Sequence, residues 1–307
     1  MKYRVIMILM LFSVLKAVPS IYAQTQAPPV DLAVIQGNDP YVSTFKALES
    51  LGGMNQFVKP GMKVGLLINS GFEEKGAYVN PDVAIAVIRM CFDAGASEVV
   101  CLQHVIPDYW HKSTNSVSDS LYLTKIRTIE KNHFPSKFDS IHFVVIDSAA
   151  GSRILRRTEV VKEVFEVDVF INIPILKHHA TTLLTGAMKN MMGLITRACN
   201  VKMHLNGPKR NDPVFLAQSI TEIFQFRKPD LYVADFTEVI TTNGPAGPGE
   251  MARPGKVLAG RDPVLMDAYA VKELNWVPED VPTLKTGVEA NLGNADLSKA
   301  KILEIRL

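Results

Sequence analysis

Short apolar runs alternate with amphipathic segments along most of the chain. The first clear run, residues 63–69, is almost continuously apolar, as expected for a strand of a sheet that is covered on both faces. Asn80-Pro81 then provides a helix start, residues 82–94 are apolar almost all round, and Gly95 provides a stop. Residues 98–103 form the next apolar run. Together these segments predict a β-α-β unit, which places parallel strands in one sheet with a right-handed crossover.

The same alternation continues to the C-terminus. Further strands are predicted at residues 141–147, 168–173, 231–235 and 256–259, with an edge strand at 302–307. Helices are predicted at residues 181–195, 213–226 and 263–275. The pattern predicts an α/β fold with an open, mainly parallel sheet and helices on both faces.

The first 23 residues have the order of a secretory signal peptide. Lys2 and Arg4 precede an apolar run over residues 5–18, and Ser20 and Ala23 belong to a short segment before the expected cleavage point. The apolar run is shorter than the ~20 residues that span a bilayer. We therefore expect cleavage after Ala23, export to the periplasm or the medium, and no stable membrane insertion after cleavage.

The remaining chain is expected to fold as one unit. Residues 24–29 are rich in Gln, Thr, Ala and Pro and predict a flexible leader. Residues 30–307 are long enough to bury a large core and are predicted to form a single α/β domain, in one or two lobes.

Charge and cysteine content exclude several classes of protein. The 307 residues include 33 basic and 31 acidic ones, and loss of residues 1–23 removes three basic and no acidic residues, leaving 30 against 31. No general attraction to nucleic acid follows, and no nucleic-acid partner is expected. Cys91 and Cys101 lie in apolar runs and are predicted to be buried thiols. With Cys199 they make three, too few for a four-thiolate iron–sulfur cluster within one chain, so no such cluster is expected.

The richest candidate chemistry follows the predicted strand 168–173. Lys177, His178 and His179 come just after it, and in open α/β sheets ligands bind outside the carboxyl ends of strands. The alternative is a solvated loop that is basic without a function.

The predicted helix 181–195 adds a second argument. At about 100° per residue, Thr182, Gly186, Lys189 and Gly193 share one narrow stripe. A glycine inside a helix costs about 1 kcal/mol relative to alanine, so something is expected to approach this stripe closely. It is either an anion held by Lys189 or another helix packed against the glycines.

Other candidates carry weaker signals. His204 follows a turn, Asn243 opens a Gly/Pro-rich loop over residues 243–249 whose backbone amides could bind an anion, and Asp235 and Asp267 are acids in apolar surroundings. Asp267 is either a ligand, simply paired, or facing solvent. No Walker loop, Rossmann glycine fingerprint, HExxH, CxxC or GxSxG motif is present.

A set of motifs identifies a family resemblance. They are Ile171-Asn172-Ile173-Pro174 leading into Lys177-x-His179, Thr185-Gly186-Ala187-Met188-Lys189-Asn190-x-x-Gly193, His204, Asn243-Gly244-Pro245 and Asp262-Pro263-Val264-x-x-Asp267-Ala268. Over about residues 64–275 the chain resembles the domain-of-unknown-function family 362. The resemblance implies an α/β domain with a polar site formed by the matched residues Lys177, His179, Lys189, Asn190, His204 and Asn243. Many relatives look like fusions to ferredoxin-type modules, which this chain lacks. The Gly-x-x-Lys segment is also similar to one in the nickel-pincer lactate racemase family, an analogy only.

Our leading hypothesis is an exported enzyme that acts on a small anion, a carboxylate or a phosphate. Lys177 and Lys189 would hold the anion, and His179 and His204 would serve as metal ligands or as an acid/base pair. The supporting residues have two expected roles. Ligand or cofactor contacts are assigned to Asn190, Asn243, Gly186 and Gly193, and completion of a divalent metal site to Asp235 and Asp267. The alternative is a periplasmic protein that binds an anionic ligand without catalysis, and an accessory redox partner ranks last.

Overall fold

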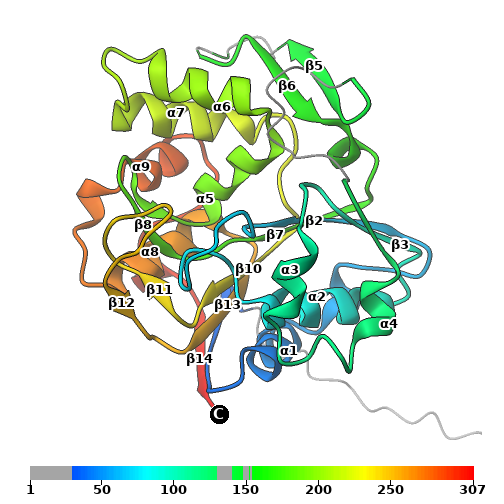
Figure 1. Ribbon diagram of the computed structural model, residues 1–307. Coiled ribbons are helices and arrows are strands. Elements are labelled where there is room, and N and C mark those ends of the chain that lie inside the picture. The colour runs from blue at the N-terminus through cyan, green and yellow to red at the C-terminus, as the bar shows by residue number, and fades with distance from the viewer. Residues whose placement is uncertain (1–29, 130–139, 148–151, 153) are drawn as a thin grey trace, which may run out of the picture.

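The computed structural model describes residues 30–129, 140–147, 152 and 154–307. The predicted signal peptide (1–23) and leader (24–29) lie outside these residues. Among the described residues, an eight-stranded sheet runs through the middle of the molecule, with helices on both of its faces (Figure 1). The predicted fold class is therefore confirmed.

The sheet has the order β14-β1-β13-β10-β7-β2-β3-β4. Its strands are β1 (Leu32–Gln36), β2 (Lys63–Ile68), β3 (Glu98–Cys101), β4 (Ile126–Thr128), β7 (Val169–Ile173), β10 (Leu231–Phe236), β13 (Lys256–Gly260) and β14 (Ile302–Arg306). Neighbours from β10 to β4 are parallel, as are β14 and β1, whereas β13 is antiparallel to both of its neighbours. The sheet is thus mainly parallel. β14 lies at its edge, as predicted. β1 and β4 were not predicted from the sequence.

Helices cover both faces of the sheet. The longer ones are α1 (Pro40–Ser50), α2 (Pro81–Asp93), α6 (Arg197–Leu205), α7 (Pro213–Ile223), α8 (Pro263–Glu273) and α9 (Pro282–Glu289). The short ones are α3 (Pro107–His111), α4 (Ser120–Leu123), α5 (Ala187–Asn190) and the 3-10 turns η1 (Met54–Gln56), η2 (Lys162–Phe165), η3 (Met191–Leu194), η4 (Pro278–Asp280) and η5 (Leu297–Lys299). α1 and α2 pack on one face, and α5 and α8 on the other.

The helix starts follow the sequence signals. The Asn80 side chain accepts a hydrogen bond from the Asp82 amide (3.0 Å), with Pro81 at the first helical position of α2. α7 and α8 begin in the same way, because Asp212 and Asp262 cap them and a proline follows each. The helices predicted at 82–94, 213–226 and 263–275 are confirmed to within a few residues at each end.

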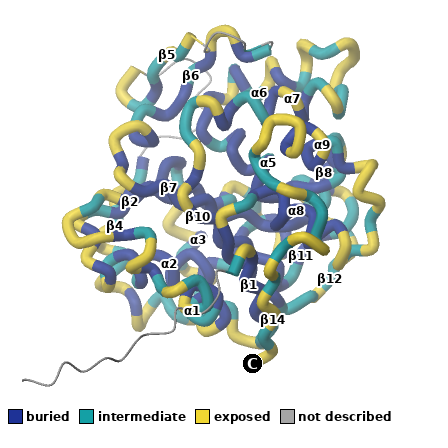
Figure 2. Tube along the Cα trace, turned by 180° about the vertical axis from the view of Figure 1, so that it is seen from behind, coloured by how far each residue is buried: buried dark blue, intermediate teal, exposed yellow. Residues whose placement is uncertain are grey.

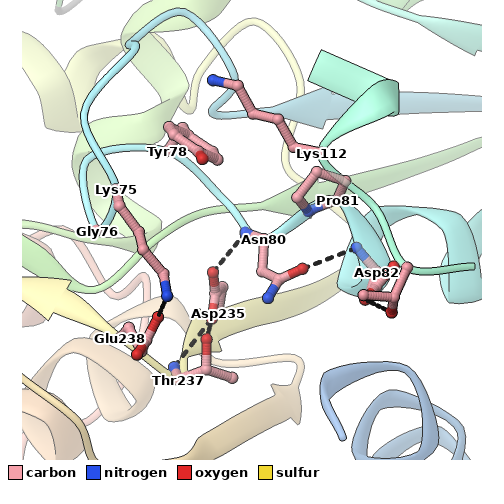
Figure 3. A pocket seen from close by; sticks show the side chains of 11 residues that line it. Lys75, Gly76, Tyr78, Asn80, Pro81, Asp82, Lys112, Asp235, Thr237 and Glu238 are labelled. Carbon is pink, nitrogen blue, oxygen red and sulfur yellow. Dashed lines mark hydrogen bonds and ion pairs between the residues drawn. The ribbon is translucent and has the colours of Figure 1, made fainter. Parts of the chain in front are cut away.

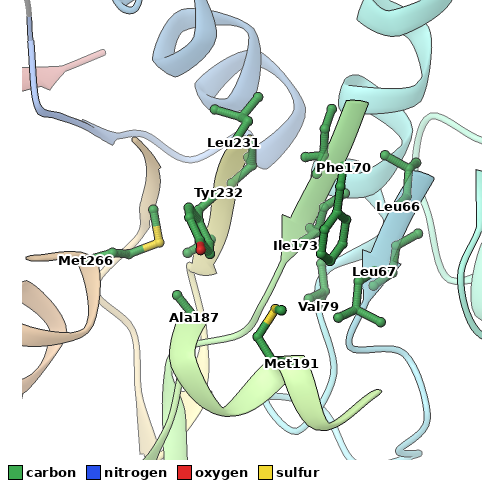
Figure 4. Packing of buried hydrophobic residues seen from close by; sticks show 14 of the residues in the cluster. Leu66, Leu67, Val79, Phe170, Ile173, Ala187, Met191, Leu231, Tyr232 and Met266 are labelled. Carbon is green, nitrogen blue, oxygen red and sulfur yellow. The ribbon is translucent and has the colours of Figure 1, made fainter. Parts of the chain in front are cut away.

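The core lies between the central strands and the helices on each face. Leu66 and Leu67 of β2 and Phe170 of β7 are fully buried, and Ala187 and Met191 pack against these strands from the other layer (Figure 4). Burial follows the strands of the sheet, while exposed positions gather in the connecting loops (Figure 2). Each Å² of apolar surface removed from water in this core stabilises the fold by about 25 cal/mol. The thiols of Cys91 and Cys101 are buried within it, as predicted.

One prediction of secondary structure is wrong, and one predicted strand lies outside the main sheet. Residues 181–195 do not form one helix, since the chain makes a hairpin of β8 (Lys177–His179) and β9 (Leu183–Thr185) before the short α5 and η3. The imidazole of His179 accepts hydrogen bonds from the backbone amides of Thr181 and Thr182, and such local bonds compete with a helix. The strand predicted at 141–147 exists as β5 (Phe143–Asp147), but it pairs with β6 (Arg157–Val161) outside the main sheet. A third ribbon joins β11 (Val239–Ile240) to β12 (Met251–Ala252).

Candidate functional site

The hairpin β8-β9 carries the predicted basic residues directly after β7. Lys177 and His179 are two residues apart on one strand, so their side chains point to the same face of the hairpin. Thr185 pairs with Lys177 across the hairpin and shares that face. His178 points the other way, where its Nδ1 accepts a hydrogen bond from the Gly244 amide (2.9 Å). Three polar side chains are thereby gathered on one surface.

Lys177 is completely buried. Its ammonium donates to the carbonyl oxygen of Pro245 and lies 3.9 Å from the centroid of the Phe72 ring. Burial, helped by the positive charge of Lys189, lowers the pKa of Lys177 to about 7. This side chain is therefore a buried base that is protonated only in part at neutral pH.

His179 is held in one tautomer by its backbone neighbours. Its Nδ1 accepts from the amides of Thr181 (3.1 Å) and Thr182 (3.3 Å). An amide N–H can only donate, so Nδ1 bears the lone pair and Nε2 of the neutral ring carries the hydrogen. Burial and the charge of Lys189 lower the pKa of His179 far below its usual value, which keeps the ring neutral. His179 thus offers an N–H donor.

His204 on α6 has the opposite tautomer. Its Nδ1 lies 3.0 Å from the side-chain oxygen of Asn211. An amide oxygen accepts, so Nδ1 carries the hydrogen and Nε2 bears the lone pair. Burial and the charge of Lys189 lower the pKa of His204, against the opposing effect of Asn211. The two rings lie 6.2 Å apart between centroids, which places a donor and an acceptor in one site.

Lys189 on α5 completes the cluster. It is half-buried, and burial lowers its pKa to about 8. Its positive charge acts on Lys177, His179 and His204. The four residues Lys177, His179, Lys189 and His204, predicted from the sequence as one site, are therefore brought together, and we call them the Lys/His cluster.

The two predicted glycines do not line one helical stripe. A Cβ on Gly186 would lie 2.2 Å from Oδ1 of Asp267, so this glycine makes room for a carboxylate. Asp267 accepts from the amides of Ala187 (2.6 Å) and Met188 (3.1 Å) at the start of α5, and its burial raises its pKa to about 7. Gly193 faces side-chain atoms of other elements. Both glycines serve packing of the site's framework.

The two asparagines also hold the framework. Nδ2 of Asn190 donates to the carbonyl of Leu67 (3.1 Å) and to the side-chain oxygen of Asn172 (2.7 Å), so both of its hydrogens tie α5 to the sheet. Asn243 adopts a positive φ of 53° and donates to the Pro248 carbonyl (3.1 Å). This bond shapes the loop that presents the Pro245 carbonyl to Lys177.

Asp235 lies in another place, at the end of β10. Its carboxylate accepts from the Asn80 amide (2.6 Å), the Thr237 amide (2.9 Å) and the Thr237 hydroxyl (2.7 Å), and burial raises its pKa. It lines a pocket of about 230 Å³ that also includes Tyr78 and Lys112 (Figure 3). The members of the Lys/His cluster are not among the residues that line this pocket.

The four residues predicted as metal ligands are not gathered into one donor set. Within the described ranges, no three His, Cys, Asp or Glu side chains are grouped so as to hold a metal ion. His179 and His204 are neighbours, but Asp235 and Asp267 are each bound to backbone amides elsewhere. The hydrogen on Nε2 of His179 further favours donation over metal ligation.

Three residues that contribute to the site had no role assigned from the sequence. The hydroxyl of Thr185 is buried and has no hydrogen-bond partner in the described part of the chain. Phe72 covers the Lys177 ammonium, and Asn211 sets the tautomer of His204. The hairpin register would have revealed Thr185, but the helix predicted there concealed it.

The described residues contain no helix that is both long enough and apolar enough to cross a membrane.

Comparisons with known proteins found a related sequence and solved structures of similar fold. It is 25% identical over 246 residues to the thylakoid-associated protein sll1697 of Synechocystis sp., covering 77% of this chain and 70% of the relative. A crystal structure of a Thermotoga maritima protein is similar over 70% of this chain, at 15% identity and a TM-score of 0.42. The lactate racemase apoprotein of Thermoanaerobacterium thermosaccharolyticum is similar over 66%, at 9% identity and a TM-score of 0.44. The chain spans 55% and 50% of these two structures.

The residues that match a known family include the whole site. Residues 58–272 match the family described as Domain of unknown function (DUF362), and this range contains the Lys/His cluster, Thr185 and Asp267. The chain belongs to the DUF362 family.

Proposed function

We propose that this protein is an exported enzyme that acts on a small anionic molecule by acid/base chemistry at the Lys/His cluster. The observation that carries the proposal is the pairing of two lysines with two histidines of opposite tautomers in one partly buried site. The N-terminal segment 1–23 supports export.

The lysines supply attraction for the anion. Lys177 and Lys189 are held in surroundings that disfavour their charge, so a bound carboxylate or phosphate would restore the protonated form of both. The Thr185 hydroxyl and Nε2–H of His179 would add hydrogen bonds to the ligand's oxygen atoms.

The histidines supply the proton transfer. Nε2 of His204 bears a lone pair and accepts a proton from the ligand, and the imidazolium so formed can return that proton later in the reaction. Nε2–H of His179 keeps its proton and donates a hydrogen bond that stabilises the charge that develops. Both rings are neutral near pH 7, because the pKa of each is lowered. A site that only binds anions would need hydrogen-bond donors alone. It would not require one histidine that donates from Nε2 beside another that accepts at Nε2.

Substitution of His204 tests this assignment. We expect His204→Asn to lower turnover at least 100-fold, because general acid/base groups contribute about 10²–10⁴-fold, while anion affinity stays within a few-fold. Turnover is measured by NMR with a panel of small carboxylates and phosphate monoesters, and affinity by calorimetry. The control is Lys285→Met, which removes the charge of an exposed lysine on α9 that is not part of the Lys/His cluster. Turnover and affinity are expected to stay unchanged in this variant. Anion binding without turnover, equal in wild type and His204→Asn, would instead identify a binding protein.

The pH dependence of kcat/KM provides a second test. The free protein must have His204 neutral and both Lys177 and Lys189 protonated to bind and react. Because the pKa of Lys177 is lowered to about 7 and that of Lys189 to about 8, kcat/KM is expected to fall as the pH rises from about 7 through about 8. It is expected to fall at low pH only below about 6.5, since the pKa of His204 is lowered. A profile that stays flat to pH 10 would contradict a role for either lysine charge.

A further inference from the structure

Among the residues that the structure describes, Lys177 and Lys189 of the Lys/His cluster form no ion pair with an acidic side chain. We propose that the ligand is a compact dianion, a tetrahedral oxyanion such as a phosphate group or a short dicarboxylate, that supplies two negative charges at once. This inference rests on the proposed function and narrows its substrate class.

Another buried lysine of the same chain shows what is missing. The ammonium of Lys256 lies 2.5 Å from a carboxylate oxygen of Glu273 and 2.8 Å from the hydroxyl of Tyr269. Buried lysines are almost always paired in this way. Lys177 is buried more completely, yet within the described ranges its ammonium contacts only a carbonyl oxygen and an aromatic ring. Lys189 makes no ion pair among the described residues.

The groups around the cluster do not supply the missing charges. The charged or titratable groups that act on its members are the members themselves and His178, all of them bases. Asp267 packs against the start of α5, but both of its oxygens are held by backbone amides. The carboxylate of Asp235 is likewise held by the amides of Asn80 and Thr237 and the Thr237 hydroxyl. Two uncompensated lysines therefore face one site, and when both are protonated a monoanion would leave one positive charge uncompensated.

The neutral groups of the site fit a ligand rich in oxygen atoms. Nε2–H of His179 and the unpartnered hydroxyl of Thr185 are donors without an acceptor in the described structure. The Thr185 hydroxyl is buried and unsatisfied in the described structure, which is rare in folded proteins, and a ligand oxygen would satisfy it. Nε2 of His204 remains as the acceptor for a hydroxyl or acidic hydrogen of the ligand.

Calorimetric titration of the purified protein with sulfate, malonate and acetate tests the inference. Sulfate is a dianion at every working pH and represents tetrahedral oxyanions, malonate represents short dicarboxylates, and acetate is the monoanion control. At pH 7 we expect sulfate or malonate to bind at least tenfold more tightly than acetate. Preference for sulfate assigns a phosphate-type ligand, and preference for malonate a dicarboxylate.

The Lys189→Met variant provides the matched comparison. Methionine keeps the length of the side chain without its charge, and Lys189 is half-buried, so the fold is expected to persist; thermal melting checks this. We expect the dianion in this variant to bind no more tightly than acetate, whereas Lys285→Met leaves all affinities unchanged. Wild-type binding should also take up protons at pH 8, seen as a dependence of the measured heat on buffer ionisation enthalpy.

The outcomes separate this inference from the proposed function. Acetate binding as tightly as both dianions, with loss in Lys189→Met, would overturn the dianion assignment but leave an anion site at the Lys/His cluster. Binding that Lys189→Met does not weaken, or no binding of any of the three anions, would overturn both.

Discussion

Replacement of Gly186 by alanine should destabilise the protein by about 3 kcal/mol or more and disturb the Lys/His cluster. The added Cβ would lie 2.2 Å from Oδ1, and 2.6 Å from Cγ, of Asp267. No real contact is that short, so Asp267 or the start of α5 must move. Because α5 carries Lys189, we expect loss of anion binding together with loss of stability.

The large effect follows from what Asp267 holds. Its carboxylate is buried and accepts from the amides of Ala187 and Met188 at the start of α5. If the carboxylate moves, two amides and a buried acid lose their partners, and each unsatisfied buried group costs about 1–3 kcal/mol. The free energy of unfolding, measured by urea denaturation, reports the change.

Two comparisons isolate the cause. Gly71→Ala is the matched control, because a Cβ at Gly71 meets nothing within 4 Å. In a Gly186→Ala/Asp267→Ala double variant, the clash is absent, so the alanine at position 186 should cost much less than in the wild-type background. Equal costs in both backgrounds would show that Asp267 is not the group that excludes a side chain there.

Gly186 shows which part of the site could be predicted from the sequence and which could not. Its place on the same predicted helical stripe as Lys189 correctly indicated that another group approaches closely. Two candidates for that group were left open, a ligand anion and a packed helix. The structure shows Asp267 of α8 in that place. Only the fold brings these two segments together, since they are far apart in the sequence and no local pattern links them.

The fold itself was predictable where local signals agreed. Continuous apolar runs predicted β2, β7 and β10, and an Asn or Asp followed by proline predicted the starts of α2 and α8. The prediction failed over 181–195 because buried residues on a hairpin and a short helix produce much the same spacing as a longer helix. The tautomers of the two histidines could not be predicted from the sequence, since they depend on where the fold places each hydrogen-bond partner.

Replacement of Lys177 by methionine should stabilise the protein at pH 7 while it abolishes anion binding. Burial lowers the pKa of Lys177 from 10.5 to about 7, which corresponds to a penalty on the order of 4 kcal/mol for holding the charge in the folded state. Methionine removes this penalty but also the hydrogen bond to the Pro245 carbonyl, worth about 1 kcal/mol. The net gain in the free energy of unfolding is therefore expected to be about 2–3 kcal/mol.

The pH dependence of stability distinguishes this cause from better packing alone. Between pH 7 and 10.5 the unfolded chain binds more protons at Lys177 than the folded protein does, so the free energy of unfolding of wild type rises with pH in this window. Below pH 7 both states are protonated, and this residue adds no slope. From pH 7 to 9 we expect a rise of about 2 kcal/mol from Lys177, with a smaller one from Lys189.

In Lys177→Met only the smaller rise should remain, whereas Lys285→Met should keep the full wild-type slope. Urea denaturation at pH 7, 8 and 9 measures both quantities. Destabilisation at pH 7 with an unchanged slope would mean that the charge of Lys177 is compensated in the folded protein, and the lysine would then be structural. Stabilisation with loss of the slope and of binding would show that the fold tolerates an unfavourable buried charge at this position, which is the expected behaviour of a binding site whose charge is neutralised only by its ligand.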